Sequence, residues 1–355
     1  MGAKALRKGR LIGDIGLRAF TQLYKKAKGL IKQEHFDFLY IPIPSFYCAL
    51  LGRLLHTSTG IKYGIDYIDP WVHTFPGSDK AFSRHWFSTQ LAKLLEPIAV
   101  KKASLITGVA QGYYQPVLDR NPHLKNVVTG AMPYGGEEKD HAIVSSFKIE
   151  PYLFKKKSEK FILVYAGAML PKAYLPLENI FNAISVDKIL FQNIEFHFIG
   201  TGKTPNDKNG FNIKPLAEKF GLYNSIVFEY PARIPYLDVL VHLNIADAVF
   251  ILGSTEPHYT PSKVYQAVLS AKPIFAVLHK ESSAVKVIEK SKAGIVLSFN
   301  GEENVELIQQ SLSASFIAFK EFEKAFTKNQ IELPIFEEYS AFAVTKKLAE
   351  LLDKV

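Results

Sequence analysis

Short apolar runs alternate with longer amphipathic segments along the chain from Phe36 onward. Runs rich in aromatic and β-branched residues predict strands, because those side chains suit a pleated, half-buried surface. Strands alternating with helices are typical of βα units on a parallel sheet. In the first half the predicted strands are residues 36–43, 61–69, 105–110 and 125–133, with helices predicted over 45–58, 81–104 and 111–121.

The second half shows the same alternation with better definition. Helical segments separate its strands, and a last helix over 337–355 has no strand after it. Six strands with helices between them predict a doubly wound domain. The predicted strands are residues 160–168, 194–202, 225–231, 247–253, 272–278 and 294–299.

Between the two halves the periodicity stops. Residues 136–159 begin with glycine, continue with charged residues and show no apolar face for a core. A chain of 355 residues also exceeds the usual size of one domain. We therefore expect an N-terminal domain over 1–135, a linker over 136–159 and a C-terminal domain over 160–335. The segment 336–355 is expected to pack back toward the N-terminal domain.

The chain is basic, with a formal net charge of +9 and a pI near 9.2. An excess of cationic groups favours anionic partners such as nucleotides, phosphorylated substrates or membrane surfaces. Residues 1–33 carry nine Lys and Arg against one acid. No sequence signature of a nucleic-acid-binding module is present, so we expect no nucleic-acid partner.

If the first 33 residues form a helix, one of its sides is basic and the other apolar. Either the apolar side packs on the sheet and the cationic side is solvated, or the helix touches anionic lipid. Packing is favoured because the apolar side has a core to cover. The helix can pack on the sheet and also contact lipid if only its cationic edge meets a membrane. The apolar side consists of Leu11 or Ile12, Ile15, Ala19, Leu23, Ala27 and Leu30.

Other sequence features favour a cytoplasmic protein. No run reaches the roughly 18 uninterrupted apolar residues of a membrane span, and the N-terminus lacks the order of a signal peptide. Cys48 is the single cysteine, which suits a reducing compartment. The ten His show no metal-ligand spacing, so we expect no metal site. The expected location is the cytoplasm, with peripheral contact at the inner membrane face.

The stretch TPSKVYQAVLSAKPIFAV offers a candidate anion site. Doubly wound domains bind ligands beyond the carboxyl ends of their strands. Thr260 is expected to cap a helix and Pro261 to stand in its first turn. Lys263 adds a positive charge, and Gln266 lies on the same face of that helix. The alternative is an ordinary βα unit with a solvated lysine.

Two further strand ends support a site for a nucleotide diphosphate. Gly200 and Gly202 follow one strand, and their lack of side chains lets the backbone approach a ligand. Gly167 ends another strand, with Lys172 close behind it. A plain turn is an equally good interpretation of either loop taken alone.

In the first half, two carboxylates accompany Trp71 and His73 in the stretch GIDYIDPWVHTF. Asp66 lies within the predicted strand, and Asp69 lies at its end, before a proline turn. Asp69 could orient a sugar hydroxyl or act as a general base. The alternative, that Asp69 only caps the following turn, stays open.

The second half resembles the C-terminal domain of family 4-type glycosyltransferases with the GT-B fold. The resemblance lies in the order of FILVYAG, FHFIGTG, VFEYPARIPYLDVLVHLNIADAVFIL and TPSKVYQAVLSAKPIFAV. In the first half, DYIDPW and EPIAVKKASLITGVA resemble segments of some bacterial members. The resemblance implies two Rossmann-like doubly wound domains that face a cleft.

This resemblance implies a retaining, metal-independent transfer of a sugar from a nucleotide-sugar donor, without any cofactor. The acceptor would be a glycan or a lipid diphosphate in cell-surface polysaccharide assembly. Asp69 falls near the catalytic position on the acceptor side. Lys263 would face the donor diphosphate, and Gln266 occupies the place of a ribose-binding Glu. The implied donor-binding residues are Gly167, Lys172, Gly200, Gly202, Glu256, His258, Thr260, Ser262, Lys263 and Gln266.

The sequence departs from the family pattern in two ways. His258 and Gln266 stand where members have a pair of Glu, and Glu256 lies close enough to compensate. A first strand with a glycine-rich loop is not recognisable, so we expect an incomplete N-terminal domain. These departures leave two alternatives open: a catalytically degenerate binding or scaffold protein, and a nucleotide-sugar epimerase of the same fold.

Overall fold

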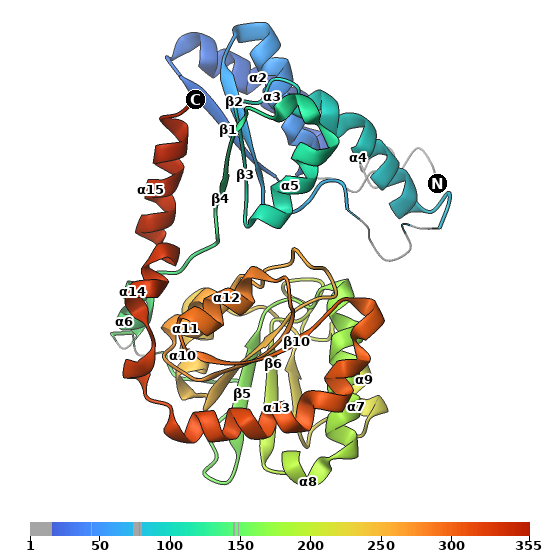
Figure 1. Ribbon diagram of the computed structural model, residues 1–355, viewed down its shortest axis with the longest axis vertical. Coiled ribbons are helices and arrows are strands. Elements are labelled where there is room, and N and C mark those ends of the chain that lie inside the picture. The colour runs from blue at the N-terminus through green and yellow to red at the C-terminus, as the bar shows by residue number, and fades with distance from the viewer. Residues whose placement is uncertain (1–15, 44, 74–77, 79, 145, 148) are drawn as a thin grey trace. The chain divides into compact units, whose positions relative to one another are not determined.

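The computed structural model describes residues 16–43, 45–73, 78, 80–144, 146–147 and 149–355 (Figure 1). The chain divides into two compact units. The first runs to Pro133 and takes up Val344–Val355, and the second spans Tyr134–Ala343. Each unit has its own parallel sheet with helices between the strands, so the predicted class of two Rossmann-like α/β domains is confirmed.

The sheet of the first unit has four parallel strands in the order β1-β2-β3-β4. In β1 the buried Ile41 and Ile43 flank the exposed Pro42, an arrangement suited to an edge strand, because proline cannot donate a ladder hydrogen bond. The register places Asp66 of β2 opposite Thr107 of β3. The strands are β1 (Phe38–Ile43), β2 (Lys62–Tyr67), β3 (Leu105–Gly108) and β4 (Val128–Ala131).

The N-terminal helix α2 packs on the first unit. Phe20, Tyr24, Ala27 and Ile31 lie against a small buried cluster that includes Leu55. The helix therefore packs on a core, as favoured, but of the described positions expected on its apolar side only Ala27 belongs to this contact. Leu23 was expected on that side but is exposed, and Leu11, Ile12 and Ile15 lie outside the described residues. The helices are α2 (Gly16–Gln33), η1 (Phe46–Cys48), α3 (Ala49–Thr59), α4 (Arg84–Val100), α5 (Gln111–Arg120) and η2 (Pro122–Leu124).

The sheet of the second unit has six parallel strands in the order β10-β9-β8-β5-β6-β7. Every residue of β8 and β9 is buried, as expected for parallel strands that helices cover on both faces. Alternate residues serve two cores: Leu163 faces one and Val164 the other. The strands are β5 (Phe161–Ala166), β6 (Ile194–Ile199), β7 (Val227–Tyr230), β8 (Ala248–Leu252), β9 (Ile274–His279) and β10 (Gly294–Phe299).

Helices cover both faces of this sheet. The helices α7 (Tyr174–Val186), α8 (Lys188–Phe191), α9 (Lys214–Lys219) and α13 (Glu306–Ala325) lie over one face (Figure 1). The other face carries α10 (Tyr236–Ile245), α11 (Lys263–Leu269) and α12 (Ser283–Lys290). The remaining short elements are η3 (Pro171–Ala173), η4 (Glu302–Asn304), η5 (Lys328–Gln330), α14 (Leu333–Phe336) and η6 (Glu337–Tyr339).

The segment expected as a linker contributes to the second unit. It forms α6 (Glu138–Val144), and its Val144 and Phe154 are buried in the second core. The sequence pattern did not indicate that this segment joins the second core, because few of the segment's residues are apolar. At the other end, α15 (Ala341–Leu352) leads from the second unit back into the first, where Leu351 is buried.

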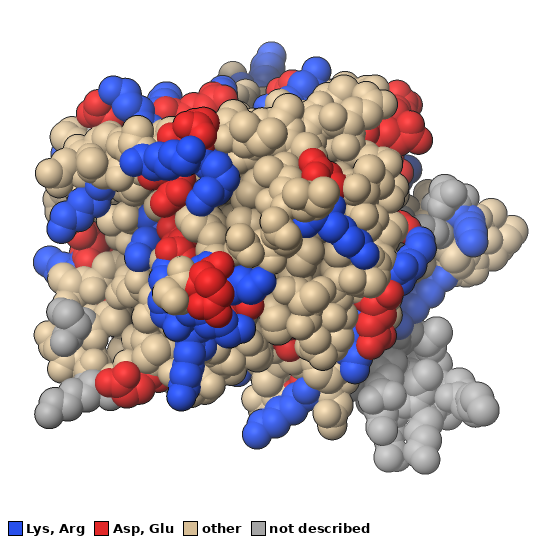
Figure 2. Space-filling view, turned by 90° about the horizontal axis from the view of Figure 1, so that it is seen from below, with Lys and Arg blue, Asp and Glu red and all other residues tan. Residues whose placement is uncertain are grey.

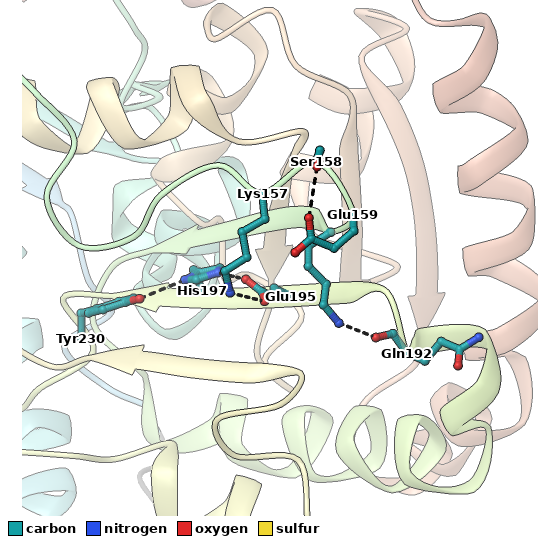
Figure 3. A network of polar contacts seen from close by, with 8 residues as sticks. Lys157, Ser158, Glu159, Gln192, Glu195, His197 and Tyr230 are labelled. Carbon is teal, nitrogen blue, oxygen red and sulfur yellow. Dashed lines mark hydrogen bonds and ion pairs between the residues drawn. The ribbon is translucent and has the colours of Figure 1, made fainter.

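A polar cluster holds the end of this segment on β6 and β7 (Figure 3). Lys157 pairs with Glu195 at 2.9 Å, and His197 Nε2 lies 3.1 Å from the second oxygen of the same carboxylate. The other imidazole nitrogen lies 3.1 Å from the hydroxyl of Tyr230. Burial lowers the pKa of His197 to about 4, although the nearby carboxylate of Glu195 acts to raise it. The neutral imidazole therefore donates to Glu195 and accepts from Tyr230.

Among the described helices, not one combines the length and the apolar character that crossing a bilayer requires.

Candidate functional site

A cavity of about 360 Å³ lies at the carboxyl ends of the strands in the second unit. Gly167 and Gly200, directly after β5 and β6, form part of its wall, as expected for a ligand site in a doubly wound domain. Most of the wall is apolar, and five polar or charged side chains interrupt it. The apolar part includes Ile199, Ile234, Val239, Leu240, Leu243, Val249 and Ile251, and the polar side chains are Arg233, Tyr236, Ser262, Lys263 and Gln266.

Lys263, the first residue of α11, crosses directly over the end of β5. A Cβ added to Gly167 would lie 1.8 Å from Lys263 Cε, so only glycine leaves room for this side chain. The ammonium group lies 5.4 Å from the centre of the Tyr165 ring. Burial, together with the nearby charge of Arg233, lowers the pKa of Lys263 to about 8.

The cavity is electropositive. In the described part of the chain neither Lys263 nor Arg233 forms an ion pair. Two cations that face one cavity without a carboxylate partner repel each other, and an anion between them relieves this repulsion. The wall can therefore hold a phosphate-containing ligand by charge, next to an apolar surface that suits a ring.

Gln266 lies one helical turn beyond Lys263 and is held from two sides. Its Oε1 is 2.7 Å from Nε2 of His141 on α6. Tyr236 accepts a hydrogen bond from the amide of Gln266 and donates to Asp140 Oδ2 at 2.9 Å. Burial lowers the pKa of His141, and its Nδ1 is buried without a hydrogen-bond partner in the structure. The imidazole is therefore neutral, with its proton on Nε2, where the carbonyl oxygen accepts it.

Five of the residues expected to bind the donor are not part of the cavity wall: Lys172, Gly202, Glu256, His258 and Thr260. The ammonium group of Lys172 lies 3.6 Å from the carboxylate of Glu256. Glu256 therefore contacts Lys172 and not Gln266. The backbone N–H of Gly202 donates to Pro231 O at 2.9 Å. Gly200, by contrast, lines the cavity.

The expected helix cap at Thr260 is wrong. The helix α11 begins at Lys263 with Ser262 in the N-cap position. The hydroxyl of the buried Thr260 instead forms a 2.7 Å hydrogen bond with that of Ser283. His258 is half-buried, and its carbonyl oxygen accepts a 3.5 Å hydrogen bond from the Thr260 hydroxyl.

Asp69 belongs to the first unit, where it is exposed on the loop after β2. Asp66 lies inside the sheet and accepts a 2.7 Å hydrogen bond from Thr107. The hydroxyl of Tyr40 lies 2.8 Å from that of Thr107. Burial raises the pKa of Asp66. Of the two carboxylates, Asp69 is the more exposed, and Asp66 is half-buried.

Sequence reasoning missed Arg233, Tyr236 and His141. Arg233 could have been found, because it follows the end of β7 just as Gly167 and Gly200 follow theirs. His141 could not, since nothing local places α6 beside α11. The described residues bring together no group of three or more His, Cys, Asp or Glu that could hold a metal ion.

The sequence matches no protein-family model and none of the curated proteins. Solved structures do match. Sucrose-phosphate synthase from Thermosynechococcus elongatus aligns with a TM-score of 0.65 at 12% identity, over 96% of this chain and 79% of that one. The chain has a GT-B-type fold.

Two more structures share this fold. HepE from Anabaena, in complex with UDP-glucose, aligns with a TM-score of 0.65 at 13% identity, over 94% of this chain and 82% of that one. The UDP-forming α,α-trehalose-phosphate synthase from Burkholderia xenovorans aligns with a TM-score of 0.67 at 11% identity, over 94% of this chain and 78% of that one. At identities this low, the similarity establishes the fold alone, and the chemistry has to be inferred from the residues of the site.

Proposed function

We propose that this chain is a retaining glycosyltransferase. It would move a sugar from a nucleotide-sugar donor to a glycan or lipid-linked acceptor in cell-surface polysaccharide assembly. The observation that carries the proposal is the cavity at the carboxyl ends of the second sheet, with Lys263 and Arg233 on its wall. The complex of HepE with UDP-glucose, a protein of the same fold, supports a nucleotide sugar as the donor.

In this proposal the second unit binds the donor. Lys263 and Arg233 stabilise the negative charge that develops on the diphosphate as the glycosidic bond breaks. Their positive charge takes the part that a metal ion plays in other transferases, so no metal and no cofactor are required. Gln266 binds the ribose hydroxyls, with its amide oriented by His141 and Tyr236. The backbone at Gly167 and Gly200 lets the phosphates approach closely.

The first unit would bind the acceptor. Asp69, exposed after β2, would orient the acceptor hydroxyl or take its proton. The protein would act in the cytoplasm, and its basic N-terminal segment would touch the anionic inner face of the membrane. A lipid-diphosphate acceptor would then be presented at that surface. Lys172 would join the donor site when its ion pair with Glu256 opens.

A second candidate function is a binding or scaffold protein that keeps the fold without the reaction. The observation that favours it is the engagement of Gln266, whose amide is already bonded to His141 and Tyr236. Such a protein would bind a nucleotide weakly or not at all, and it would release no nucleotide from a nucleotide sugar.

Thermal unfolding with UDP, GDP and their sugars tests the proposal. A ligand present at 100 times its Kd stabilises the protein by roughly 2.7 kcal/mol. We expect a shift with one nucleotide family, lost in Lys263→Met and kept in Lys208→Met, a solvent-exposed control. No shift with any of these ligands would rule out the transferase. A shift without nucleotide release in the presence of lipid or glycan acceptors would favour the binding protein.

A further inference from the structure

One side of α4 is apolar and exposed. Phe87, Leu94 and Ile98 are 55%, 65% and 49% exposed. Their spacing of seven and four residues places them along one side of the helix, and the half-buried Leu91 lies between the first two. Phe82, just before the helix, is 78% exposed. These four exposed side chains form what we call the α4 surface.

The opposite side of α4 already serves the core of the first unit, through Ala92, Ala99 and Val100. The helix is thus apolar on two sides. A helix of this kind is normally covered all round, and contiguous apolar patches on a protein surface mark interaction sites. The described residues of the first unit leave the α4 surface exposed, which makes it a candidate contact surface for a partner.

Aromatic rings gather at the start of the α4 surface. The ring centres of Phe82 and Trp86 lie 5.5 Å apart, and those of Trp86 and Phe87 lie 5.0 Å apart. Phe82 has a φ of 63°, which is strained for a bulky residue and typical of functional positions. Trp belongs to the side chains enriched at the boundary between water and lipid, because it joins an apolar ring to a polar N–H.

Along residues 80–102, the stretch that carries the α4 surface, the exposed charges have one sign. The single acid between residues 80 and 102 is Glu96, which is buried and bonded to Arg120 at 2.9 and 3.0 Å. The exposed cations are Lys80, Arg84, Lys93, Lys101 and Lys102. By contrast, acidic and basic side chains are interspersed on the face shown in Figure 2. An exposed apolar side of a helix that is flanked along its own sequence by cations complements an anionic lipid surface.

We propose that the α4 surface docks on an anionic lipid membrane. Its apolar side chains enter the headgroup region, and the surrounding Lys and Arg contact lipid phosphates. A second copy of the chain fits less well, because a symmetric pair would bring the same five cations together. The inference concerns the first unit alone and holds whether or not the cavity binds a nucleotide. It places the contact on α4.

Vesicle flotation of the full chain tests the inference. We expect binding to phosphatidylcholine vesicles that contain phosphatidylglycerol, and none to phosphatidylcholine alone. The variant Leu94→Gln/Ile98→Gln removes exposed apolar area and should weaken binding about tenfold or more. The matched control is Val186→Gln/Ile189→Gln, at two exposed apolar positions of the second unit.

Charge variants give an independent readout. Lys93→Glu/Lys101→Glu should weaken binding roughly thirtyfold or more, because each of the two lost cations contributes about 1 kcal/mol near an anionic surface and each new carboxylate is repelled by it. Lys155→Glu/Lys208→Glu makes the same change in net charge elsewhere and should bind as the natural chain does. All of these positions are exposed, and circular dichroism melts verify that each variant is folded.

Tryptophan fluorescence reports on the surface directly. The chain has two Trp. Trp71 is buried against Phe46 and Tyr47, whereas Trp86 belongs to the aromatic group before Phe87. Anionic vesicles should shift the emission to shorter wavelength, brominated lipids should quench it, and Trp86→Phe should abolish both effects.

Several results would overturn the inference. One is equal binding to both kinds of vesicle, or to neither. Another is that both α4 variants bind vesicles as the natural chain does, whereas Lys25→Glu/Lys26→Glu no longer binds. This result would place the contact on α2. A third is a concentration-dependent dimer that Leu94→Gln/Ile98→Gln dissociates, which would make a second copy the partner. Vesicle flotation tests membrane docking, and nucleotide-dependent thermal shifts test the transferase. Either experiment can give a negative result without the other, so the two proposals are tested separately.

Discussion

His141 and Gln266 are joined by a 2.7 Å hydrogen bond between the imidazole Nε2 and the amide Oε1, although 125 positions separate them in the sequence. His141 comes from α6 and Gln266 from α11. Because the imidazole is neutral and can donate only from Nε2 here, it fixes which end of the amide is the acceptor. The NH₂ group then points toward Tyr236. Gln266 is thus oriented before any ligand binds.

If the oriented amide holds a ribose, Gln266→Leu should weaken UDP binding and leave pyrophosphate binding unchanged, since pyrophosphate has no ribose. One neutral hydrogen bond contributes about 0.5–1.5 kcal/mol, so the loss in UDP affinity should be about two- to tenfold. Titration calorimetry with both ligands measures it. Gln309→Leu, at an exposed position of α13, is the control. An equal loss for both ligands would mean that Gln266 only supports the wall.

His141 should act on the ligand through Gln266. We therefore expect His141→Phe to weaken UDP binding, and the double variant with Gln266→Leu to be no weaker than Gln266→Leu alone. Residues in direct contact show coupling energies of about 0.5–3 kcal/mol in such cycles. The four UDP affinities give this coupling. Additive losses would show that His141 affects the site by another route.

Binding of a nucleotide diphosphate should take up a proton above about pH 8. The pKa of Lys263 is lowered to about 8, so by about pH 9 the free protein holds this amine mostly neutral. A bound diphosphate favours the charged form and raises the pKa again. Calorimetry of UDP binding in two buffers of different ionisation enthalpy measures the uptake, which should vanish toward about pH 6.5.

The matched variant for this experiment is Lys263→Arg. Arginine stays charged throughout this pH range, so the variant should bind UDP without taking up a proton. Uptake that persists in Lys263→Arg would assign the proton to another group. No uptake in the natural protein would mean that the diphosphate does not contact Lys263.

Both sheets could be predicted because every strand carries its own signal. The buried runs of β8 and β9 and the alternation in β1 reflect where each residue lies relative to a sheet. The helix α6 carries no such signal. It is seven residues long, and helices this short depend on tertiary contacts for their stability, here including the hydrogen bond from Tyr236 to Asp140.

The wall of the cavity could be predicted only in part. Lys263, Gln266 and Gly200 were indicated by their positions after strands, and all three line it. Thr260 was misjudged because a Thr-Pro pair is a common helix start, while its actual partner, Ser283, lies on α12. Contacts of this kind depend on how helices pack, which local sequence does not specify.

Gly167→Ala should displace the side chain of Lys263. The added methyl group would lie 1.8 Å from Lys263 Cε, and the φ of 147° is unfavourable for alanine. We expect a lower free energy of unfolding and weaker UDP binding, measured by urea titration and calorimetry. The added variant Lys263→Ala should recover part of the stability in the double variant, because it removes the clash. No recovery would mean that backbone strain alone causes the loss.

Gly29→Ala serves as the control for that substitution. Gly29 lies within α2, and a Cβ there would meet nothing within 4 Å. Alanine is the better helix former by about 0.5–1 kcal/mol. This variant should therefore stabilise the first unit slightly and leave UDP binding unchanged.

Acid should weaken the second unit through His197. Its folded pKa of about 4 lies below the ordinary value near 6.5 in the unfolded chain. The unfolded state therefore binds the proton first as the pH falls. Stability from this group is fully present above about pH 6.5 and is lost as the pH falls toward about 4, by on the order of 3 kcal/mol. Urea unfolding across this pH range measures the slope.

His197→Gln removes the titrating group, so its stability should depend less on pH in that window than the stability of the natural chain. His123→Gln, at an exposed position of the first unit, should leave the slope unchanged. Protonation of His197 at Nδ1 would break the hydrogen bond that this nitrogen accepts from the hydroxyl of Tyr230. Tyr230→Phe removes this donor but keeps the burial of the imidazole, so most of the slope should remain. A slope that disappears in Tyr230→Phe would make the hydrogen bond, and not burial, the main cause of the lowered pKa of His197.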